Sequence, residues 1–131
     1  MRISKKTQYG LRAMVYLAHC RFKNKTCPLK KISQEEGIPF DFLGKIFSKL
    51  GKANLVSAKK GVQGGYFLTK KPEEIKIGQI IEALEEKISL VRCFRYFCPR
   101  EKKCLAKNFW RKLNKTINSA LNSMTLADLI K

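Results

Sequence analysis

The sequence contains few acidic side chains and almost none of the groups that perform acid–base catalysis. Among its 131 residues are 10 Asp and Glu and a single histidine. No carboxylate pair, Ser-His-Asp set or Cys-His pair occurs at a spacing useful for hydrolytic or acid–base chemistry. These absences exclude the common hydrolytic sites, and we expect a protein that is not an enzyme.

Long apolar runs are also missing. A transmembrane helix needs about 20 consecutive apolar residues, and no segment approaches that length. The start of the chain is too polar to form the apolar part of a signal peptide. We therefore expect a cytoplasmic protein without a membrane partner. In that reducing compartment, its five cysteines are expected to be metal ligands or buried thiols.

Positive charge is what the chain has in excess. Its 28 Lys and Arg residues give a formal net charge of +18. This is more than solubility requires and indicates a polyanionic partner, with nucleic acid as the first candidate. The lack of a separate basic amphipathic segment argues against an anionic membrane surface. The length allows one domain with one hydrophobic core and an appended element.

Two short segments predict a helix-turn-helix. A first helix opens at Pro28 and ends at Gly37. In the second, residues 40–50, one face is polar and basic, and the other is predicted to be an apolar core stripe of Phe40, Leu43, Ile46, Phe47 and Leu50. A solvated face on an ordinary bundle helix would show the same pattern, so the segment that follows decides between them.

That segment predicts a β-hairpin. Two β-rich runs, 55–60 and 66–69, flank the glycine-rich sequence G-V-Q-G-G. A phosphate-binding loop is the rival interpretation, but such a loop leads into a helix, and here a second strand follows. A basic hairpin after a helix-turn-helix predicts a winged helix, whose helix enters the major groove of DNA while its wing reaches the minor groove or phosphates. The residues predicted to contact DNA are Lys45, Ser48, Lys49, Lys52, Lys59, Lys60 and Gln63.

Three cysteines lie close together in a basic stretch. Cys93, Cys98 and Cys104 are separated by four and five residues. Thiolate is the soft ligand of iron–sulfur clusters and zinc, and the surrounding Arg and Lys side chains would stabilise it. Reduced, inert thiols or a disulfide plus one spare thiol are the alternatives. Because the stretch is polar and a cytosolic chain rarely keeps disulfides, a metal or cluster is the favoured interpretation.

The other cysteines and the acidic residues receive structural interpretations. Ser4 is predicted to be the N-cap of a first helix, in which Cys20 belongs to the core. Cys27 follows in a polar connection and is predicted to be an exposed bystander. The only acidic patch ends a later helix and is expected to be solvated; it comprises Glu82, Glu85 and Glu86.

The C-terminal part predicts a long amphipathic helix. Apolar residues recur at helical spacing from Ala106 to Met124, and this stripe exceeds what a small core can cover, so we expect a homodimer. The expected fold is mainly α with a small β-hairpin wing. It comprises a winged helix-turn-helix DNA-binding domain (1–86), a cysteine cluster-binding loop (87–105), and a dimerisation helix with a short final helix (106–131).

Several stretches resemble a known family. They are M-R-I-S-K-K-T-Q-Y-G-L-R-A-M, E-E-G-I-P-F-D-F-L-G-K-I-F-S-K-L, L-V-S-A-K-K-G-V-Q-G-G-Y-F-L, K-I-G-Q-I-I-E-A-L-E and T-L-A-D-L-I. They are similar to the IscR/NsrR/CymR superfamily of winged-helix regulators, the Rrf family, along nearly the whole chain. The resemblance implies a homodimer on a pseudo-palindromic DNA operator and an iron–sulfur cluster that adjusts the DNA-binding helices. It also implies that Cys93, Cys98 and Cys104 are ligands of a 2Fe-2S or 4Fe-4S cluster.

The sequence departs from this family at informative positions. Lys107 stands where IscR-like members have a histidine ligand, and Gln8 stands where other members take a carboxylate. The only histidine, His19, is more often a structural residue, so the fourth ligand is open. An open site favours a labile sensor of a small molecule such as nitric oxide or oxygen. Gly44 replaces a glutamate of the recognition helix and Lys60 replaces a wing arginine, which predicts a different operator.

The leading hypothesis is a DNA-binding transcriptional regulator whose operator affinity is controlled by the cluster. A second hypothesis keeps the fold and the DNA but replaces the cluster by direct thiol oxidation or by structural zinc. A third hypothesis is a basic redox protein or an RNA-binding protein. Each of these leaves part of the winged-helix pattern unexplained.

Overall fold

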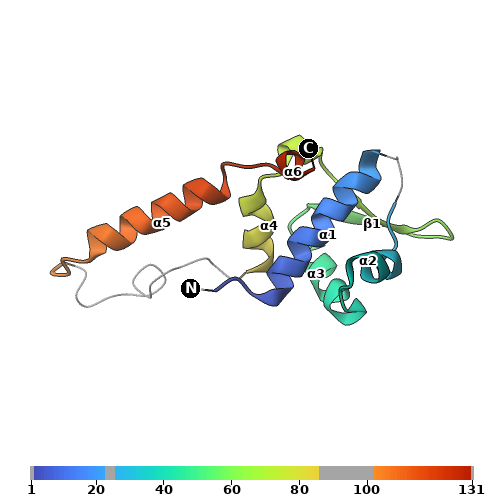
Figure 1. Cartoon of the computed structure of the whole chain (residues 1–131), viewed down its shortest axis with the longest axis horizontal. Helices are drawn as coiled ribbons and strands as arrows, with labels where there is room; N and C mark the ends of the chain where they lie inside the picture. The colour runs from blue at the N-terminus through green and yellow to red at the C-terminus, as the bar shows by residue number, and fades with distance from the viewer. Residues whose placement is uncertain (1, 23–25, 86–101, 131) are drawn as a thin grey trace.

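The computed structural model describes residues 2–22, 26–85 and 102–130 (Figure 1). Its helices are α1 (Lys5–Phe22), α2 (Leu29–Glu36), α3 (Phe40–Lys52), α4 (Ile77–Leu84), α5 (Lys107–Leu121) and α6 (Leu126–Leu129). The strands β1 (Val56–Lys59) and β2 (Gly65–Leu68) form one antiparallel hairpin, and a 3-10 turn, η1 (Pro72–Glu74), precedes α4. The expected class, mainly helical with a small hairpin, is confirmed. Among the described helices, none is both long and apolar enough to cross a membrane.

Helices α1, α3 and α4 enclose the core. Phe40, the first residue of the apolar stripe predicted for α3, is wrong as a core residue because 54% of it is exposed. The rest of the stripe is fully buried, as predicted, and consists of Leu43, Ile46, Phe47 and Leu50. It packs against α1 and α4. Helix α1 begins after Ser4, whose hydroxyl accepts a hydrogen bond from the Thr7 backbone N–H at 3.2 Å. This geometry confirms Ser4 as an N-cap.

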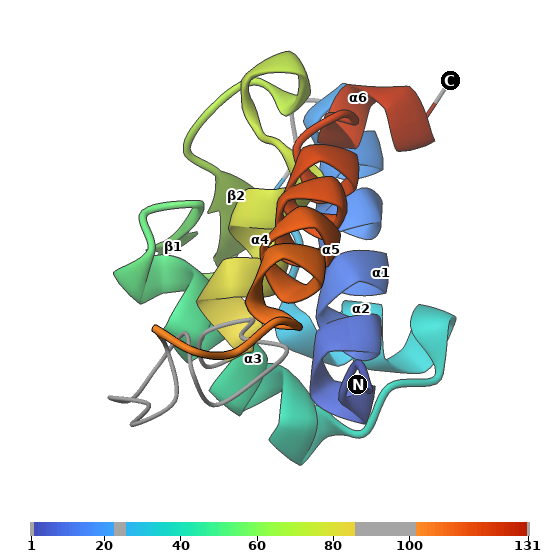
Figure 2. The ribbon, with the colours of Figure 1, turned by 90° about the vertical axis from the view of Figure 1, so that its left-hand side faces the viewer.

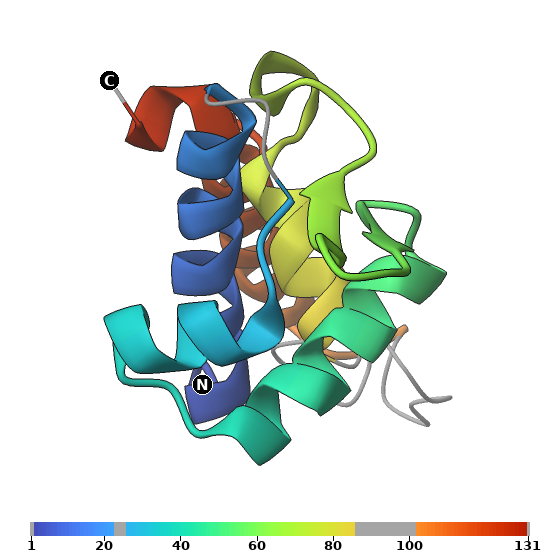
Figure 3. The same ribbon diagram turned by 90° about the vertical axis from the view of Figure 1, so that its right-hand side faces the viewer.

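The hairpin begins close to the end of α3. Leu55 donates a backbone hydrogen bond to Leu50 at 3.1 Å, and Val56 is buried opposite Leu68 in the hairpin register. The base of the hairpin therefore shares the core with α3, while its tip extends into solvent. Figure 3 shows α3 running toward the base of this hairpin.

Helix α5 extends away from the core, whereas α6 returns to it. In Figure 1, α5 projects beyond α4, and Figure 2 shows it in front of α1 and α4. No residue of α5 is buried. By contrast, Leu126 of α6 is fully buried, and its backbone N–H donates to Ile75 at 2.8 Å. The final short helix thus packs with the N-terminal part of the chain.

Two predictions about cysteines are wrong. Cys27 is not an exposed bystander: only 1% of it is exposed, and it is bonded to Cys20 in a disulfide. Nor is either of these two residues a metal ligand or free thiol. The two Cα atoms lie 6.7 Å apart, within the range of protein disulfides. The fold brings the cysteines together because the chain reverses direction between α1 and α2.

The acidic patch is also only partly as expected. Glu82 is exposed, but Glu85 is half-buried and its carboxylate accepts hydrogen bonds from the Ser4 backbone N–H and the Thr7 hydroxyl. Glu86 lies outside the described residues. Glu85 therefore joins the end of α4 to the start of α1, where the helix dipole favours a negative charge.

Candidate nucleic-acid interface

The outer face of α3 is polar, basic and open. Lys45, Ser48 and Lys52 are exposed on the side opposite the buried stripe. Gly44 lies on the same open side, and a Cβ atom placed there would have no heavy atom within 4 Å. The turn before α3 is made by Gly37, whose positive φ of 63° suits glycine. This arrangement leaves a full helix face free for a macromolecular partner.

Lys49 differs from the other predicted DNA contacts on α3. It is half-buried, and its positive charge acts on Glu85. The pKa of Glu85 is lowered chiefly by the hydrogen bond from the Ser4 backbone N–H, with smaller contributions from the Ser4 and Thr7 side chains and from Lys49. Lys49 therefore lies toward the α1–α4 side of the helix.

The predicted wing residues lie at or near the exposed tip of the hairpin. Lys59, Lys60 and Gln63 are exposed, and Val62 between them is fully exposed. The side chains of Lys59 and Lys60 make no hydrogen bond or ion pair with the described part of the chain. Their charges add to those of α3, so that the helix and the wing together present a basic surface.

The wing is supported from behind by the segment that precedes α2. Cys27 and Tyr66 exchange two backbone hydrogen bonds, of 2.9 and 2.8 Å, which make Cys27 an isolated bridge partner of β2. The Thr26 hydroxyl donates to the Gln63 carbonyl at 2.7 Å. The ring of Tyr66 also packs on Phe47 of α3, with 4.7 Å between centroids. These contacts fix the wing relative to α3 and to the segment of Thr26 and Cys27.

Glycine permits the close approach of this support. A Cβ atom at Gly65 would lie 2.5 Å from the carbonyl carbon of Cys27 and 2.7 Å from its oxygen. This contact was not predicted from the sequence. The glycine-rich tip was visible in the sequence, but nothing there indicated which distant backbone the second strand would meet.

Only one of the three predicted cluster ligands falls in the described part of the chain. Cys104 is a free, half-buried cysteine shortly before α5. Cys93 and Cys98 lie outside the described residues. Within the described ranges, no group of three or more His, Cys, Asp or Glu side chains could hold a metal ion. A single thiol does not make a cluster site. Whether the chain can hold an iron–sulfur cluster therefore depends on Cys93 and Cys98 as well.

The candidate fourth ligands do not converge on Cys104 in any described contact. Lys107 is the first residue of α5, and His19 is exposed on α1. The side-chain amide of Gln8 donates to the Ile3 carbonyl at 3.0 Å. The described residues therefore leave the fourth ligand open.

Comparison with known proteins identifies one family. The Rrf2 family, described as an iron-dependent transcriptional regulator, matches residues 3–131. The transcriptional regulator IscR of Vibrio atlanticus is 36% identical over 132 residues, which cover 100% of this chain and 76% of that protein. The solved structure of T. potens IscR gives a TM-score of 0.80 at 35% identity and covers 99% of this chain and 86% of that one. CymR, described as the global cysteine regulator of B. subtilis, gives 0.83 at 34% identity and covers 99% and 96%.

Proposed function

The chain belongs to the Rrf2 family of transcriptional regulators, and on that premise we propose that it binds an operator as a homodimer under the control of an iron–sulfur cluster. The observation that carries the DNA-binding part is the joint basic surface of α3 and the wing. The cluster part rests on the three closely spaced cysteines.

DNA binding is assigned to two elements with different tasks. The exposed face of α3 offers Lys45, Ser48 and Lys52 to the major groove, and the wing offers Lys59, Lys60 and Gln63 to phosphates or the minor groove. Lys49 belongs to the proposed set but lies at its edge. Removing one phosphate contact should reduce the slope of log affinity against log salt by about 0.9.

The homodimer is assigned to α5. Phe109 is 58% exposed, and Leu113, Ile117 and Leu121 are only half-buried. An amphipathic helix without a buried residue is stabilised when a partner covers its apolar face. A second copy would supply an identical stripe and would set two half-sites about 34 Å apart.

The cluster is assigned to Cys93, Cys98 and Cys104, with a fourth ligand that is unknown. Thiolates suit a 2Fe-2S or a 4Fe-4S cluster, which when bound would supply an iron centre sensitive to redox state and to small molecules. Cys104 is three residues before the start of α5. Ligation at its sulfur would restrict the start of that helix and thereby bias the relative orientation of the two DNA-binding units.

The likeness to CymR supports a second candidate. In this version the same three cysteines sense oxidation directly or hold zinc, and the DNA-binding surface is unchanged. Zinc prefers four good ligands, so the open fourth position argues against it. Native mass spectrometry of the purified protein separates iron and sulfide from zinc and from bare thiols by mass and metal content.

The deciding experiment is anaerobic purification followed by absorption spectroscopy, iron and sulfide analysis, and operator binding. We expect visible absorption, bound iron and sulfide, and an operator affinity that changes when the cluster is removed. The combined variant Cys93→Ser, Cys98→Ser and Cys104→Ser should show no visible absorption, no bound iron or sulfide, and no change of operator affinity on cluster removal. If the unsubstituted protein is colourless and iron-free and binds the operator as tightly as this variant, the cluster has no part in the function. The proposed DNA binding is tested separately, by whether the protein binds the operator at all.

A further inference from the structure

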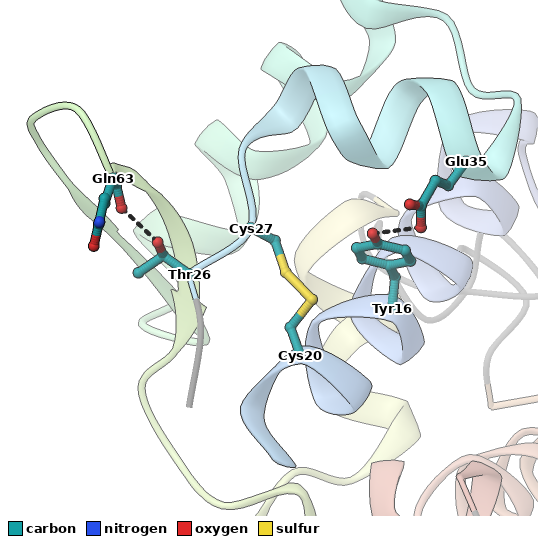
Figure 4. The surroundings of a disulfide bond; sticks show 6 residues. All are labelled: Tyr16, Cys20, Thr26, Cys27, Glu35 and Gln63. Carbon is teal, nitrogen blue, oxygen red and sulfur yellow. Dashed lines mark hydrogen bonds between the residues drawn. A yellow bond between two sulfur atoms is a disulfide. The ribbon is translucent and has the colours of Figure 1, made fainter. Parts of the chain in front are cut away.

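The disulfide between Cys20 and Cys27 lies directly behind the wing. Cys20 is in the last turn of α1, and Cys27 is the residue whose backbone pairs with Tyr66 of β2. Figure 4 shows the bridge between α1 and the segment that leads into α2, with Thr26 reaching Gln63 on the wing. One disulfide bond therefore connects α1 to the segment that pairs with β2 of the hairpin.

We propose that Cys20 and Cys27 form a second redox site, independent of the other three cysteines, whose disulfide fixes the wing and whose reduction by a small thiol releases it. This inference rests on the proposed DNA-binding role of the wing.

The contacts of Cys27 explain why its covalent state reaches the wing. On one side it is tied to β2 by the two backbone hydrogen bonds and by the close approach of Gly65. On the other side the disulfide ties it to α1, where the neighbouring Leu17 and Ala18 are buried. Helix α1 is thus the fixed partner. Without the bond, the segment of Cys27 and the wing paired with it are held to α1 only by the intervening backbone and by noncovalent contacts.

A cavity gives a small molecule access to this bond. It has a volume of about 390 Å³ and is lined in part by both cysteines, His19, Lys31 and Glu35. Cys20 is partly exposed, whereas Cys27 is 1% exposed. Because Cys20 is the more exposed of the two residues, we expect a nucleophile in the cavity to attack the sulfur of Cys20.

The charges around the cavity indicate the class of thiol. Lys31 and Glu35 lie one turn apart on α2 and place a cation and a carboxylate at its wall. Glu35 accepts a hydrogen bond from the Tyr16 hydroxyl at 2.5 Å, which holds the carboxylate beside the cavity. Burial and this hydrogen bond raise the pKa of Tyr16 to about 12, so it stays a donor. This pair of charges suits a small thiol that carries both a carboxylate and an ammonium group, such as free cysteine.

The chemistry is thiol–disulfide exchange. The thiolate of the small molecule attacks the sulfur of Cys20, the bond to Cys27 breaks, and Cys27 leaves as a thiolate that takes up a proton. A second small thiolate then attacks the mixed disulfide at the sulfur of the bound small molecule. Cys20 leaves as a thiolate and takes up a proton. Two small thiols are oxidised to one disulfide, and the protein disulfide is reduced by the same two electrons.

The expected consequence is weaker DNA binding by the reduced protein. A wing held in place before binding loses less conformational freedom when it meets DNA. We expect the disulfide form to bind an operator about three- to tenfold more tightly than the dithiol form, the range that preorganisation of a few side chains provides.

The first test measures operator affinity of the full chain at fixed salt in oxidised and reduced states. Cys93→Ser, Cys98→Ser and Cys104→Ser are combined as the background, so that no cluster contributes. In this background, Cys20→Ser should bind like the reduced protein under both conditions. The same comparison of the unsubstituted chain with the single variant Cys20→Ser covers the case in which the background does not fold. Equal affinity of the oxidised and reduced forms overturns the inference while leaving DNA binding intact; no affinity in any form overturns the proposed function instead.

The second test identifies the reacting sulfur and the preferred thiol. Oxidised protein is treated with free cysteine or with neutral 2-mercaptoethanol, quenched with iodoacetamide and mapped by peptide mass spectrometry. We expect the adduct on Cys20, the alkyl label on Cys27, and faster reaction with cysteine than the intrinsic reactivities of the two thiols predict. Lys31→Ala should remove that preference, whereas Lys30→Ala, an exposed neighbour that does not line the cavity, should keep it. An adduct on Cys27, or no preference in the unsubstituted chain, contradicts the assignment of the cavity.

Discussion

The N-terminal part of the molecule and α5 handle their apolar residues in opposite ways. Helix α3 buries four large side chains completely, whereas α5 buries none although its apolar spacing is just as regular. The same difference separates the cysteines: the bridge of Cys20 and Cys27 is built into the core region, and Cys104 lies near the start of the uncovered helix. The winged helix therefore covers its own apolar face within one chain, whereas the apolar face of α5 is left uncovered in the described part of the chain.

The largest effect should come from opening the core behind the wing. Phe47 is fully buried and packs on Tyr66, so Phe47→Ala should lower the free energy of unfolding by about 3–5 kcal/mol. Phe109→Ala on α5 is the matched change at an exposed phenylalanine. Urea unfolding of the two variants at protein concentrations low enough to favour monomers should show a large loss for the first and a small one for the second. Equal losses would contradict the division between a buried and an uncovered region.

The next effect should come from charging the stripe of α5. Leu113→Glu combined with Ile117→Glu places two charges on the proposed dimer contact, where neither residue supports the core of one chain. We expect a folded monomer whose operator affinity is lower by about 100-fold, because the two half-sites no longer act together. Analytical ultracentrifugation and operator titration measure both results.

Lys115→Glu changes an exposed residue of the same helix and is the control for charge. It should remain a dimer. A dimer that survives the double substitution would place the partner contact elsewhere.

A smaller effect should follow from separating the wing from its support. Gly65→Ala forces a methyl group against the backbone of Cys27, which should cost about 1–3 kcal/mol of stability and weaken operator binding. Gly44→Ala is the contrasting change on α3, since it meets open space and removes a helix glycine. It should raise stability by about 0.5–1 kcal/mol. Thermal unfolding and DNA titration of both variants test these predictions. If Gly65→Ala changes neither stability nor operator affinity, the close approach of the two backbones is not required.

The smallest effect concerns pH. The pKa of Glu85 is lowered in the folded protein, chiefly by the Ser4 backbone N–H, so the carboxylate binds protons less readily when folded. Its contribution to stability is therefore present above the ordinary value of 4.5 and is lost as the pH falls through the lower folded value. Glu85→Gln should cost about 1 kcal/mol at neutral pH and flatten the acid limb of the stability curve. Glu82→Gln, an exposed change on the same helix, should leave that limb unchanged.

Local patterns were sufficient for most of the secondary structure. The helical spacing of Leu43, Ile46, Phe47 and Leu50 correctly predicted the buried face of α3, because a period of 3.6 residues puts them on one side. The glycines between two β-rich runs correctly predicted a hairpin. The exposure of Lys45, Ser48 and Lys52 followed from the same periodicity.

Contacts between distant segments were not predictable in the same way. Cys27 was expected to be exposed because its neighbours are polar, yet the pairing with Tyr66 and the position of Cys20 bury it. Glu85 was expected to be solvated, yet its hydrogen-bond partners are 81 and 78 residues away in sequence. Such partners are chosen by the packing of helices and not by the composition around either residue.

The sequence by itself determined the winged-helix class, the basic character of the interface and the stripe of α5, because each follows from charge or from the period of apolar residues in one segment. Only the tertiary structure decided that the wing is supported by Cys27, that Cys27 is joined to Cys20, and that α6 returns to the core. These features depend on which backbones meet after α1, α3 and α4 have packed, and that is a property of three dimensions.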